Sequence, residues 1–359
     1  MHPSSGGRPI LPGLIRGYVA PALALAVLAV LLSAGCLGGF TAFPPDVVYP
    51  SIAPIEGAPS HPVTFTYAFE DSTVTLTVPI SGPVFYGAQR AVKNATLVRD
   101  LPDERWIPGY YQAFVSDPAQ EGFYGDVLSE FRRVKAEKNL DSDRYVELMA
   151  VAVQSMPYRT SGDDTPPRFP VETFAERTGD CDDKSTLLAG LLSREGYRVA
   201  LLVFRPENHV AVGIAAPDCR YRNTSYAYVE ATNLSLVGIP PEEIQGPIRF
   251  LTSDPLVIPI GNGTIPYGAC GQTTAIDRAL LRAREEAISL NRQLKAKDTE
   301  MDRAKSSGNT AEYNRMVPEY NRMVADQNRA VDTNNYILRH LYDRPGTYHW
   351  LKIRGLVQG

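Results

Sequence analysis

The sequence predicts an α+β fold, because strand-like and helical patterns occupy separate parts of its 359 residues. Residues 61–80 contain two alternating apolar and polar runs around a pair of acidic residues, which is typical of a β-hairpin. Residues 142–156 carry apolar side chains at helical spacing, whereas residues 197–230 contain further strand-like runs. The apolar residues between 276 and 341 follow heptad steps, so we expect a long antiparallel helical hairpin there.

The N-terminal residues predict export from the cytoplasm. Two arginines precede an apolar run at residues 18–32, which ends in the small residues "SAGC". This ending is similar to a lipoprotein lipobox, in which Cys36 is lipidated and becomes the first mature residue, although Ser33 occupies the usual leucine position. An uncleaved anchor helix over residues 18–40 is the alternative, since about 20 residues span a bilayer. Both readings predict an extracytoplasmic, membrane-anchored protein at the cell surface.

Changes in composition along the chain predict its remaining boundaries. The net charge of −4 and the absence of a long basic run give no reason to expect a nucleic-acid partner. We expect a signal peptide at 1–36, a Pro-rich linker at 37–61, a β-rich N-terminal subdomain at 62–117, a core at 118–268, the helical hairpin at 269–342 and a C-terminal tail at 343–359.

A cysteine marks the start of a helix in the stretch "RTGDCDDKSTLLAGLL". Asp180 is the expected N-cap, and the leucine stripe that follows Cys181 places the thiol at the helix N-terminus, turned toward the packed face. The partial positive charge of that terminus stabilises a thiolate, so we expect a reactive nucleophile. Asp182 and Asp183 favour the helix dipole but oppose a nearby thiolate.

A histidine and a glutamate lie on the two strands that follow, in "NHVAVGIA" and "SYAYVEA". If the loop between them closes a symmetric antiparallel hairpin, His209 and Glu230 lie directly opposite each other, with Cβ atoms about 4.5–5.5 Å apart. An imidazole can accept the thiol proton, and a carboxylate can orient the imidazole. A bulge or a one-residue slip would separate the pair.

The stretches "GDCDDK", "NHVAVG" and "YVEAT" together resemble the prokaryotic, secreted branch of the transglutaminase-like superfamily, relatives of the papain-like cysteine peptidases. The resemblance covers about residues 144–241. It implies a papain-like core and acyl transfer through a thioester. In that scheme Cys181 is the nucleophile and His209 the general base and acid. Glu230 stands where most members of the superfamily carry aspartate.

Other residues have roles that the sequence leaves more open. The backbone N–H of Cys181 is the first expected oxyanion donor, and Gln154 or Tyr158 is the second. In an oxidising compartment we expect Cys219 and Cys270 to form a disulfide.

Metal binding is not the main expectation. The histidines and cysteines lack zinc-site spacing, and no cofactor is expected. A calcium site is the alternative that the carboxylates allow, built from Asp182 and Asp183 with Asp163 or Asp164.

Two functions follow from these patterns. The first is a cysteine-dependent amidase or peptidase that acts on a protein or peptide, with release of the acyl group by water or by a second amine. The second is a catalytically inactive envelope binding module, in which the helical hairpin docks a protein partner and polar residues such as Lys297, Gln327 and Asn334 set the pairing register. The repeat "EYNRMV" at 312 and 319 indicates helix packing. We expect the second arm to pack through Tyr313, Val317, Tyr320, Val324, Gln327, Val331, Asn334, Leu338 and Leu341.

Overall fold

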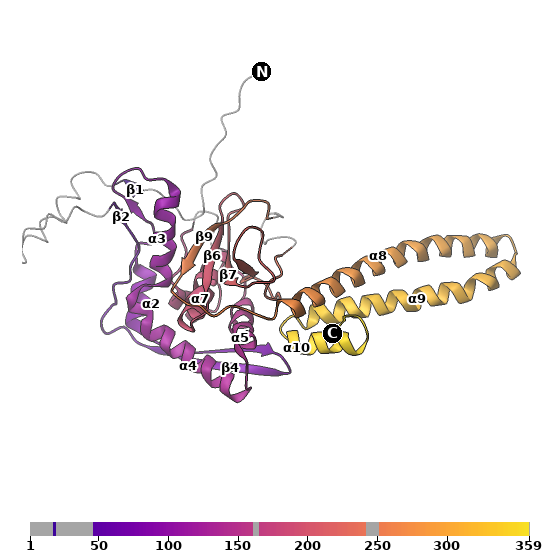
Figure 1. The fold of residues 1–359 in the computed structure, drawn as a ribbon, viewed down its shortest axis with the longest axis horizontal. Helices are drawn as coiled ribbons and strands as arrows, with labels where there is room; N and C mark the ends of the chain where they lie inside the picture. The colour runs from indigo at the N-terminus through magenta and orange to yellow at the C-terminus, as the bar shows by residue number, and fades with distance from the viewer. Residues whose placement is uncertain (1–16, 19–45, 161–164, 242–250, 359) are drawn as a thin grey trace, which may run out of the picture. The chain divides into compact units, whose positions relative to one another are not determined.

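The computed structural model describes residues 17–18, 46–160, 165–241 and 251–358 (Figure 1). Helices make up 51% and strands 16% of the structure, which confirms the α+β class. The chain forms two compact units, the first containing residues up to Tyr67 and Thr73–Gly268, the second Ala68–Ser72 and Ala269–Gly359. Cys36 and most of the predicted signal and linker lie outside the described residues. None of the described helices is both long and apolar enough to span a membrane.

The predicted β-hairpin is formed by β3 (His61–Phe69) and β4 (Ser72–Ile80). Val63, Phe65 and Tyr67 of β3 lie on one face and are buried, because alternate residues of a strand point to one side. A small sheet with the strand order β1-β5-β2 follows a different part of the chain: β1 (Gly17–Tyr18), β2 (Val47–Val48) and β5 (Thr96–Leu97).

The chain is mostly helical between residues 82 and 154, so the β-rich character expected for 62–117 is limited to the β3–β4 hairpin and the two-residue strand β5. The aromatic residues Trp106, Tyr110 and Phe114 have helical spacing and are all buried. The elements here are α2 (Gly82–Arg90), α3 (Asp103–Val115), the short 3₁₀ helix η1 (Pro118–Gln120), α4 (Glu121–Glu137) and α5 (Ser142–Gln154).

A four-stranded antiparallel sheet with the order β8-β7-β6-β9 forms the other half of this unit. Its strands are β6 (Val199–Phe204), β7 (His209–Ala215), β8 (Tyr226–Val229) and β9 (Leu256–Ile260). All residues of β6 are buried, so this strand is covered on both faces.

Helix α7 (Cys181–Arg194) is the centre of the unit, since every residue from Cys181 to Leu192 is buried. It contacts β6 and β7 of the sheet and the helices α3, α4, α5 and α6 (Pro170–Glu176). Gly190 allows the close approach of α4, because a Cβ atom at this position would lie 2.2 Å from the Tyr124 hydroxyl oxygen.

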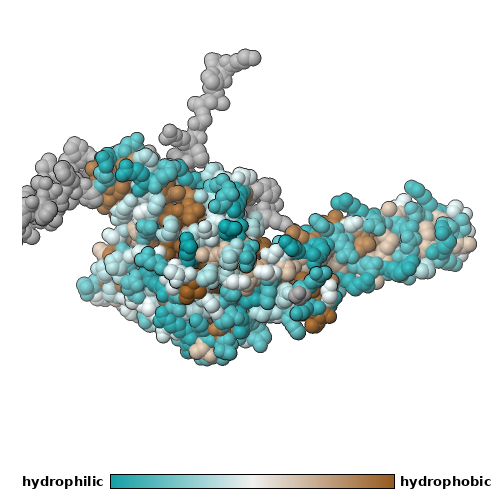
Figure 2. Space-filling model, viewed as in Figure 1, coloured by the Kyte–Doolittle hydropathy of each residue, from teal (hydrophilic) through white to brown (hydrophobic). Residues whose placement is uncertain are grey.

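The second unit contains the predicted helical hairpin, formed by α8 (Cys270–Ser306) and α9 (Thr310–Arg339), which lie side by side in Figure 1. Asn309 is the N-cap of α9, because its side-chain oxygen accepts a hydrogen bond from Glu312 N at 3.1 Å. Lys297 Nζ on α8 pairs with Glu319 on α9 at 3.2 Å. The predicted tail instead begins with α10 (Arg344–Ile353). On the side drawn in Figure 2, hydrophobic residues are scattered among hydrophilic ones along the hairpin.

The contact line of α8 follows the heptad steps: Ile276, Ala283 and Leu294 are buried, and Leu280 and Ala287 on the same line are half-buried. The line predicted on α9 is wrong for Val331 and Leu338, which are 37% and 43% exposed. Their preceding neighbours Ala330 and Ile337 are buried in their place. The heptad repeat of α9 fits two adjacent lines along the helix, one through Ala330 and Ile337 and one through Val331 and Leu338. The spacing alone does not distinguish between them.

Candidate active site

The N-terminus of α7 is built as a capping box. Asp180 Oδ1 accepts hydrogen bonds from Asp182 N at 3.1 Å and Asp183 N at 3.2 Å. Asp183 Oδ2 in turn accepts from Asp180 N at 3.3 Å. These bonds satisfy N–H groups that have no partner within a helix, so α7 begins at Cys181 and Asp180 is the N-cap, as predicted.

Asp183 also anchors the preceding loop through Arg168. The Arg168 backbone N donates to Asp183 Oδ1 at 2.7 Å, and the guanidinium Nε donates to Asp183 Oδ2 at 2.8 Å. Gly179 lies against the same side chain, since a Cβ atom there would lie 2.7 Å from Asp183 Cβ. Asp183 therefore holds the loop on which the cap is built.

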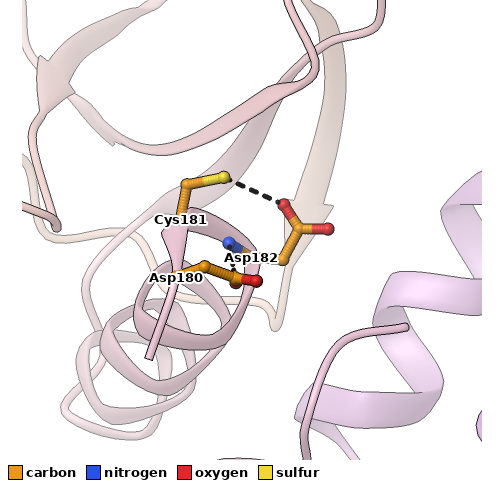
Figure 3. A group of neighbouring side chains, drawn as sticks. All are labelled: Asp180, Cys181 and Asp182. Carbon is orange, nitrogen blue, oxygen red and sulfur yellow. Dashed lines mark hydrogen bonds between the residues drawn. The ribbon is translucent and has the colours of Figure 1, made fainter. Parts of the chain in front are cut away.

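Asp182 contacts the thiol directly (Figure 3). Cys181 Sγ donates to Asp182 Oδ1 at 3.4 Å, and the Tyr111 hydroxyl donates to Asp182 Oδ2 at 3.1 Å. Burial raises the pKa of Asp182 to about 7, and burial together with the charges of Asp183 and Asp182 raises the pKa of Asp180 to about 8. The carboxyl group of Asp182 is thus the acidic group in direct contact with the sulfur.

The thiol of Cys181 is neutral at rest, contrary to the expectation of a thiolate. Burial raises its pKa well above the usual value, and the charges of Asp182 and Asp180 raise it further. A hydrogen bond with the backbone of Val210 lowers the pKa, but it is the weaker influence. The helix N-terminus favours a thiolate, but the burial of Cys181 opposes it more strongly, since the residue is only 9% exposed.

The register of β7 and β8 differs from the predicted one. Gly213 lies opposite Tyr228 rather than Tyr226, so His209 and Glu230 are not directly opposite. The connecting loop is asymmetric, because Tyr221 N donates to Tyr226 O at 2.7 Å and Arg222 adopts a positive φ of 47°. A shift of two residues keeps the alternation of side chains unchanged, so His209, Tyr228 and Glu230 remain on one face.

Tyr228 bridges the two predicted site residues. His209 Nε2 lies 2.9 Å from the Tyr228 hydroxyl oxygen, and this hydroxyl donates to Glu230 Oε2 at 3.0 Å. Glu230 Oε1 accepts from Ala231 N at 3.0 Å, and from Thr232 N at 2.7 Å and Thr232 Oγ1 at 2.5 Å. The carboxyl group is therefore an acceptor in every contact.

This chain of hydrogen bonds fixes the tautomer of His209. Tyr228 has one hydroxyl hydrogen, which points to Glu230, so its oxygen must accept a hydrogen from His209 Nε2. Burial lowers the pKa of His209, against the opposing charges of Glu230 and Glu207, which favours the neutral ring. A neutral ring protonated at Nε2 has a free lone pair at Nδ1.

The thiol and the imidazole come from adjoining parts of the site. The Val210 amide that contacts the sulfur belongs to the residue after His209. A thiolate at Cys181 would raise the pKa of the Tyr228 phenol, so the sulfur lies near the bridge. Among the described residues no hydrogen bond joins Cys181 Sγ to the His209 ring. The predicted thiol, imidazole and carboxylate are thus gathered at one place, with Tyr228 as the member that the sequence analysis missed.

The two expected oxyanion donors have different outcomes. Gln154 Nε2 donates to Glu230 O at 2.8 Å and to Ser235 O at 3.1 Å, so both of its hydrogens are engaged and it anchors the loop after β8 instead. Tyr158 pairs with Gly179 at the loop before α7. Burial raises the pKa of Tyr158, and a thiolate at Cys181 would raise it further, so the Tyr158 hydroxyl is a protonated donor near the sulfur.

Lys184 is a second residue without an assigned role in the sequence analysis. Its ammonium group is buried and donates to Gln154 O at 3.3 Å, Met156 O at 2.7 Å and Thr232 O at 3.0 Å. Burial lowers its pKa to about 8, although the charge of Glu230 favours the cation. A lysine in the first turn of a helix is opposed by the helix dipole. This unfavourable placement of Lys184 is the sequence signal for an unusual environment.

Asp180, Cys181 and Asp182 are the described residues whose ligand atoms come closest to the pattern of a metal site, all within 4.8 Å of one another (Figure 3). Two carboxylates supply only part of the six to eight oxygen atoms that calcium takes. Asp163 and Asp164, the other expected ligands, lie outside the described residues. Cys219 and Cys270 are both disulfide-bonded, and Cys181 is a free cysteine.

Comparison with known proteins identifies no relative: no family model matches the chain, and no curated protein or solved structure matches it either. The class of the protein is therefore argued from the site.

Proposed function

We propose that this chain is a membrane-tethered, extracytoplasmic enzyme of the transglutaminase-like class, with a papain-like core that forms a thioester at Cys181 and acts as an amidase or peptidase. The observation that carries the proposal is the His209–Tyr228–Glu230 chain, with distances of 2.9 and 3.0 Å, beside a buried thiol at a helix N-terminus. A proton acceptor held in one tautomer next to a cysteine is the arrangement that acyl transfer requires.

The reaction begins from a neutral pair. As Cys181 Sγ attacks the carbonyl carbon of an amide, its proton passes to His209 Nδ1 and an S–C bond forms. The resulting imidazolium donates its proton to the leaving nitrogen, the C–N bond breaks, and a free amine departs. Water or a second amine then attacks the thioester, the S–C bond breaks, and the thiol is restored with its proton. Glu230 stabilises the imidazolium through Tyr228.

Binding of substrate must first release the thiol from Asp182. The S–H group donates to this carboxylate at 3.4 Å in the free protein, which holds the hydrogen away from an imidazole. A substrate that only expels water from the site would not produce the thiolate, because burial of Cys181 raises the pKa of its thiol. The Cys181 backbone N–H and the Tyr158 hydroxyl are the donors we assign to the developing oxyanion.

The test is trapping of the acyl-enzyme. The full chain is incubated with a mixture of unfolded peptides, quenched in acid, and analysed by intact-mass spectrometry and peptide mapping. We expect an acyl group on Cys181 and new peptide N-termini in solution. Hydroxylamine should release the acyl group as a hydroxamate, since a thioester reacts with this nucleophile and an amide does not.

Variants separate this activity from a contaminant. Cys181→Ala should abolish both the adduct and the cleavage, and His209→Ala should reduce both while leaving the thiol in place. Identical peptide products from the wild type and from Cys181→Ala would rule the enzyme out.

A catalytically inactive envelope binding module is the second candidate, and the resting state of the thiol favours it. A cysteine whose pKa is raised by burial and by two carboxylates is poorly nucleophilic. In that case no acyl adduct forms with any peptide, and the helical hairpin carries the function.

A further inference from the structure

Helix α9 carries a heptad pattern that its contacts with α8 do not use. An asparagine occurs at every seventh position from Asn314 to Asn335, and a valine or leucine follows each of them three residues later. Seven residues make almost two helical turns, so each set forms a line along the helix, and the two lines are neighbours. We call one part of this surface the asparagine seam: Asn321, Val324, Asn328, Val331, Asn335 and Leu338.

Most of the seam is open to solvent, whereas Val324 and Asn335 are half-buried and Asn335 Oδ1 accepts a hydrogen bond from Asn334 Nδ2 at 3.2 Å. Asn321 and Asn328 are exposed, and their carboxamides make no hydrogen bond with any described residue. Val331 and Leu338 are 37% and 43% exposed, although they are large apolar side chains in a regular helix. Buried contacts with α8 use Ala330 and Ile337 instead. Val331 and Leu338, two of the three apolar residues of the seam, are therefore not covered within the hairpin.

The exposed apolar side chains of α8 lie on the same side. Leu281 and Ile288 are 38% and 48% exposed, and each directly follows a residue of the contact line. Val331 and Leu338 also directly follow contact-line residues. In an antiparallel pair of right-handed helices, one step forward along either chain turns toward the same side of the pair. All the large exposed apolar residues of α8 and α9 thus gather on one side.

Helix α10 packs on the other side of the hairpin. Arg282 on α8 and Arg329 on α9 each precede a contact-line residue, which turns them away from the seam. Together with Trp350 of α10 they line a cavity of about 620 Å³, and Arg282 Nη2 donates to Leu356 O at 2.8 Å. The C-terminal residues therefore cover one side of the hairpin and leave the seam uncovered.

We propose that the asparagine seam pairs with the same seam of a second copy of this chain, the two α9 helices lying parallel and in register. In this arrangement each residue lies at the height of its own copy, so asparagine layers alternate with valine and leucine layers. A carboxamide has both donors and acceptors, so it complements its own copy. A different partner would need asparagines at the same heights, whereas a second copy supplies them by symmetry.

Cross-linking tests the register directly. In the full chain, kept in detergent and carrying Cys181→Ala, Asn321→Cys is compared with Arg322→Cys under mild oxidation. Arg322 is exposed and lies one residue further round the helix, away from the seam. We expect Asn321→Cys to give a two-chain band on a non-reducing gel, and Arg322→Cys to stay at one chain.

The second measurement is the mass in solution by sedimentation equilibrium. The wild type should show twice the mass of one 39.4 kDa chain, and Val331→Glu combined with Leu338→Glu should halve it. Ile353→Glu is the matched control, because Ile353 is a 65% exposed apolar residue of α10 outside the seam. The proposal is overturned by a one-chain mass of the wild type, by equal cross-linking of Arg322→Cys, or by linkage of Asn321→Cys only to a chain carrying Asn335→Cys.

Discussion

Replacing Asp182 with asparagine is expected to make Cys181 more reactive. The carboxylate raises the pKa of the thiol in two ways, through its charge and through the hydrogen bond that it accepts from Sγ at 3.4 Å. Asparagine keeps the size of the side chain and one of its two acceptor oxygens, but removes the charge. The amide oxygen can accept the hydrogen bond that Tyr111 donates to Oδ2 at 3.1 Å, which places the amide NH₂ beside the sulfur, so the fold should tolerate the change.

The size of the effect follows from the thiolate fraction and its nucleophilicity. A neighbouring charge commonly moves a pKa by about 1–3 units. Below the pKa, each unit raises the thiolate fraction about tenfold. A less basic thiolate is also a weaker nucleophile, by about threefold per unit, at a Brønsted coefficient of about 0.4–0.5. Alkylation should therefore accelerate about threefold for a pKa lowered by one unit and about tenfold for two units.

The assay is the second-order rate of iodoacetamide reaction at Cys181, followed by peptide mass spectrometry from acidic to alkaline pH. Asp180→Asn should give a smaller acceleration, because the charge of Asp180 contributes less than that of Asp182 and asparagine still caps the helix. Asp126→Asn, at an exposed position of α4, should leave the rate unchanged. An equal or slower rate in Asp182→Asn would show that Asp182 does not hold the proton on the sulfur.

Three further predictions concern the groups around the site. Tyr228→Phe removes the hydroxyl that joins His209 to Glu230, so acyl-enzyme formation should fall about 10- to 100-fold with a changed pH profile. Tyr221→Phe, whose ring lies 5.4 Å from that of Tyr228, should behave as wild type, and equal rates in both variants would exclude the bridge. Gln154→Leu should lower the free energy of unfolding, measured in urea, by about 2–4 kcal/mol, because it leaves the carbonyls of Glu230 and Ser235 without this donor. A variant of full stability but reduced activity would instead support the role of Gln154 as an oxyanion donor. Burial lowers the Lys184 pKa from 10.5 to about 8, so between pH 8 and 10.5 the unfolded chain binds more protons than the folded one. The free energy of unfolding should therefore rise with pH over this range, by about 3 kcal/mol in total. Lys184→Met should lack this rise, and the same pH dependence in both proteins would contradict the assignment.

Local signals made parts of the fold readable from the sequence. The β3–β4 hairpin and the start of α7 depend on residues close together in the chain, namely alternation around Glu70 and Asp71 and the cap at Asp180. The same holds for the cap of α9 at Asn309. Prediction succeeded where sequence neighbours supply the stabilising contacts.

Features that depend on distant residues were not readable. The β7–β8 register is set by the irregular loop around Arg222, and alternation alone does not count residues across a turn. The raised pKa of Cys181 depends on burial, and burial needs the whole fold. The placement of Tyr228 between His209 and Glu230 follows from that register and was hidden for the same reason.

The proton held on Cys181 has a consequence for how the other cysteines stay paired. Thiol–disulfide exchange requires a thiolate as the attacking group, and a protonated sulfur reacts slowly. Cys219 and Cys270 are both disulfide-bonded, while Cys181 is a free cysteine of the same chain. By keeping Cys181 protonated, the Asp182 carboxylate prevents the thiol from attacking the disulfide-bonded cysteines. This protection lasts until a substrate displaces the thiol from Asp182.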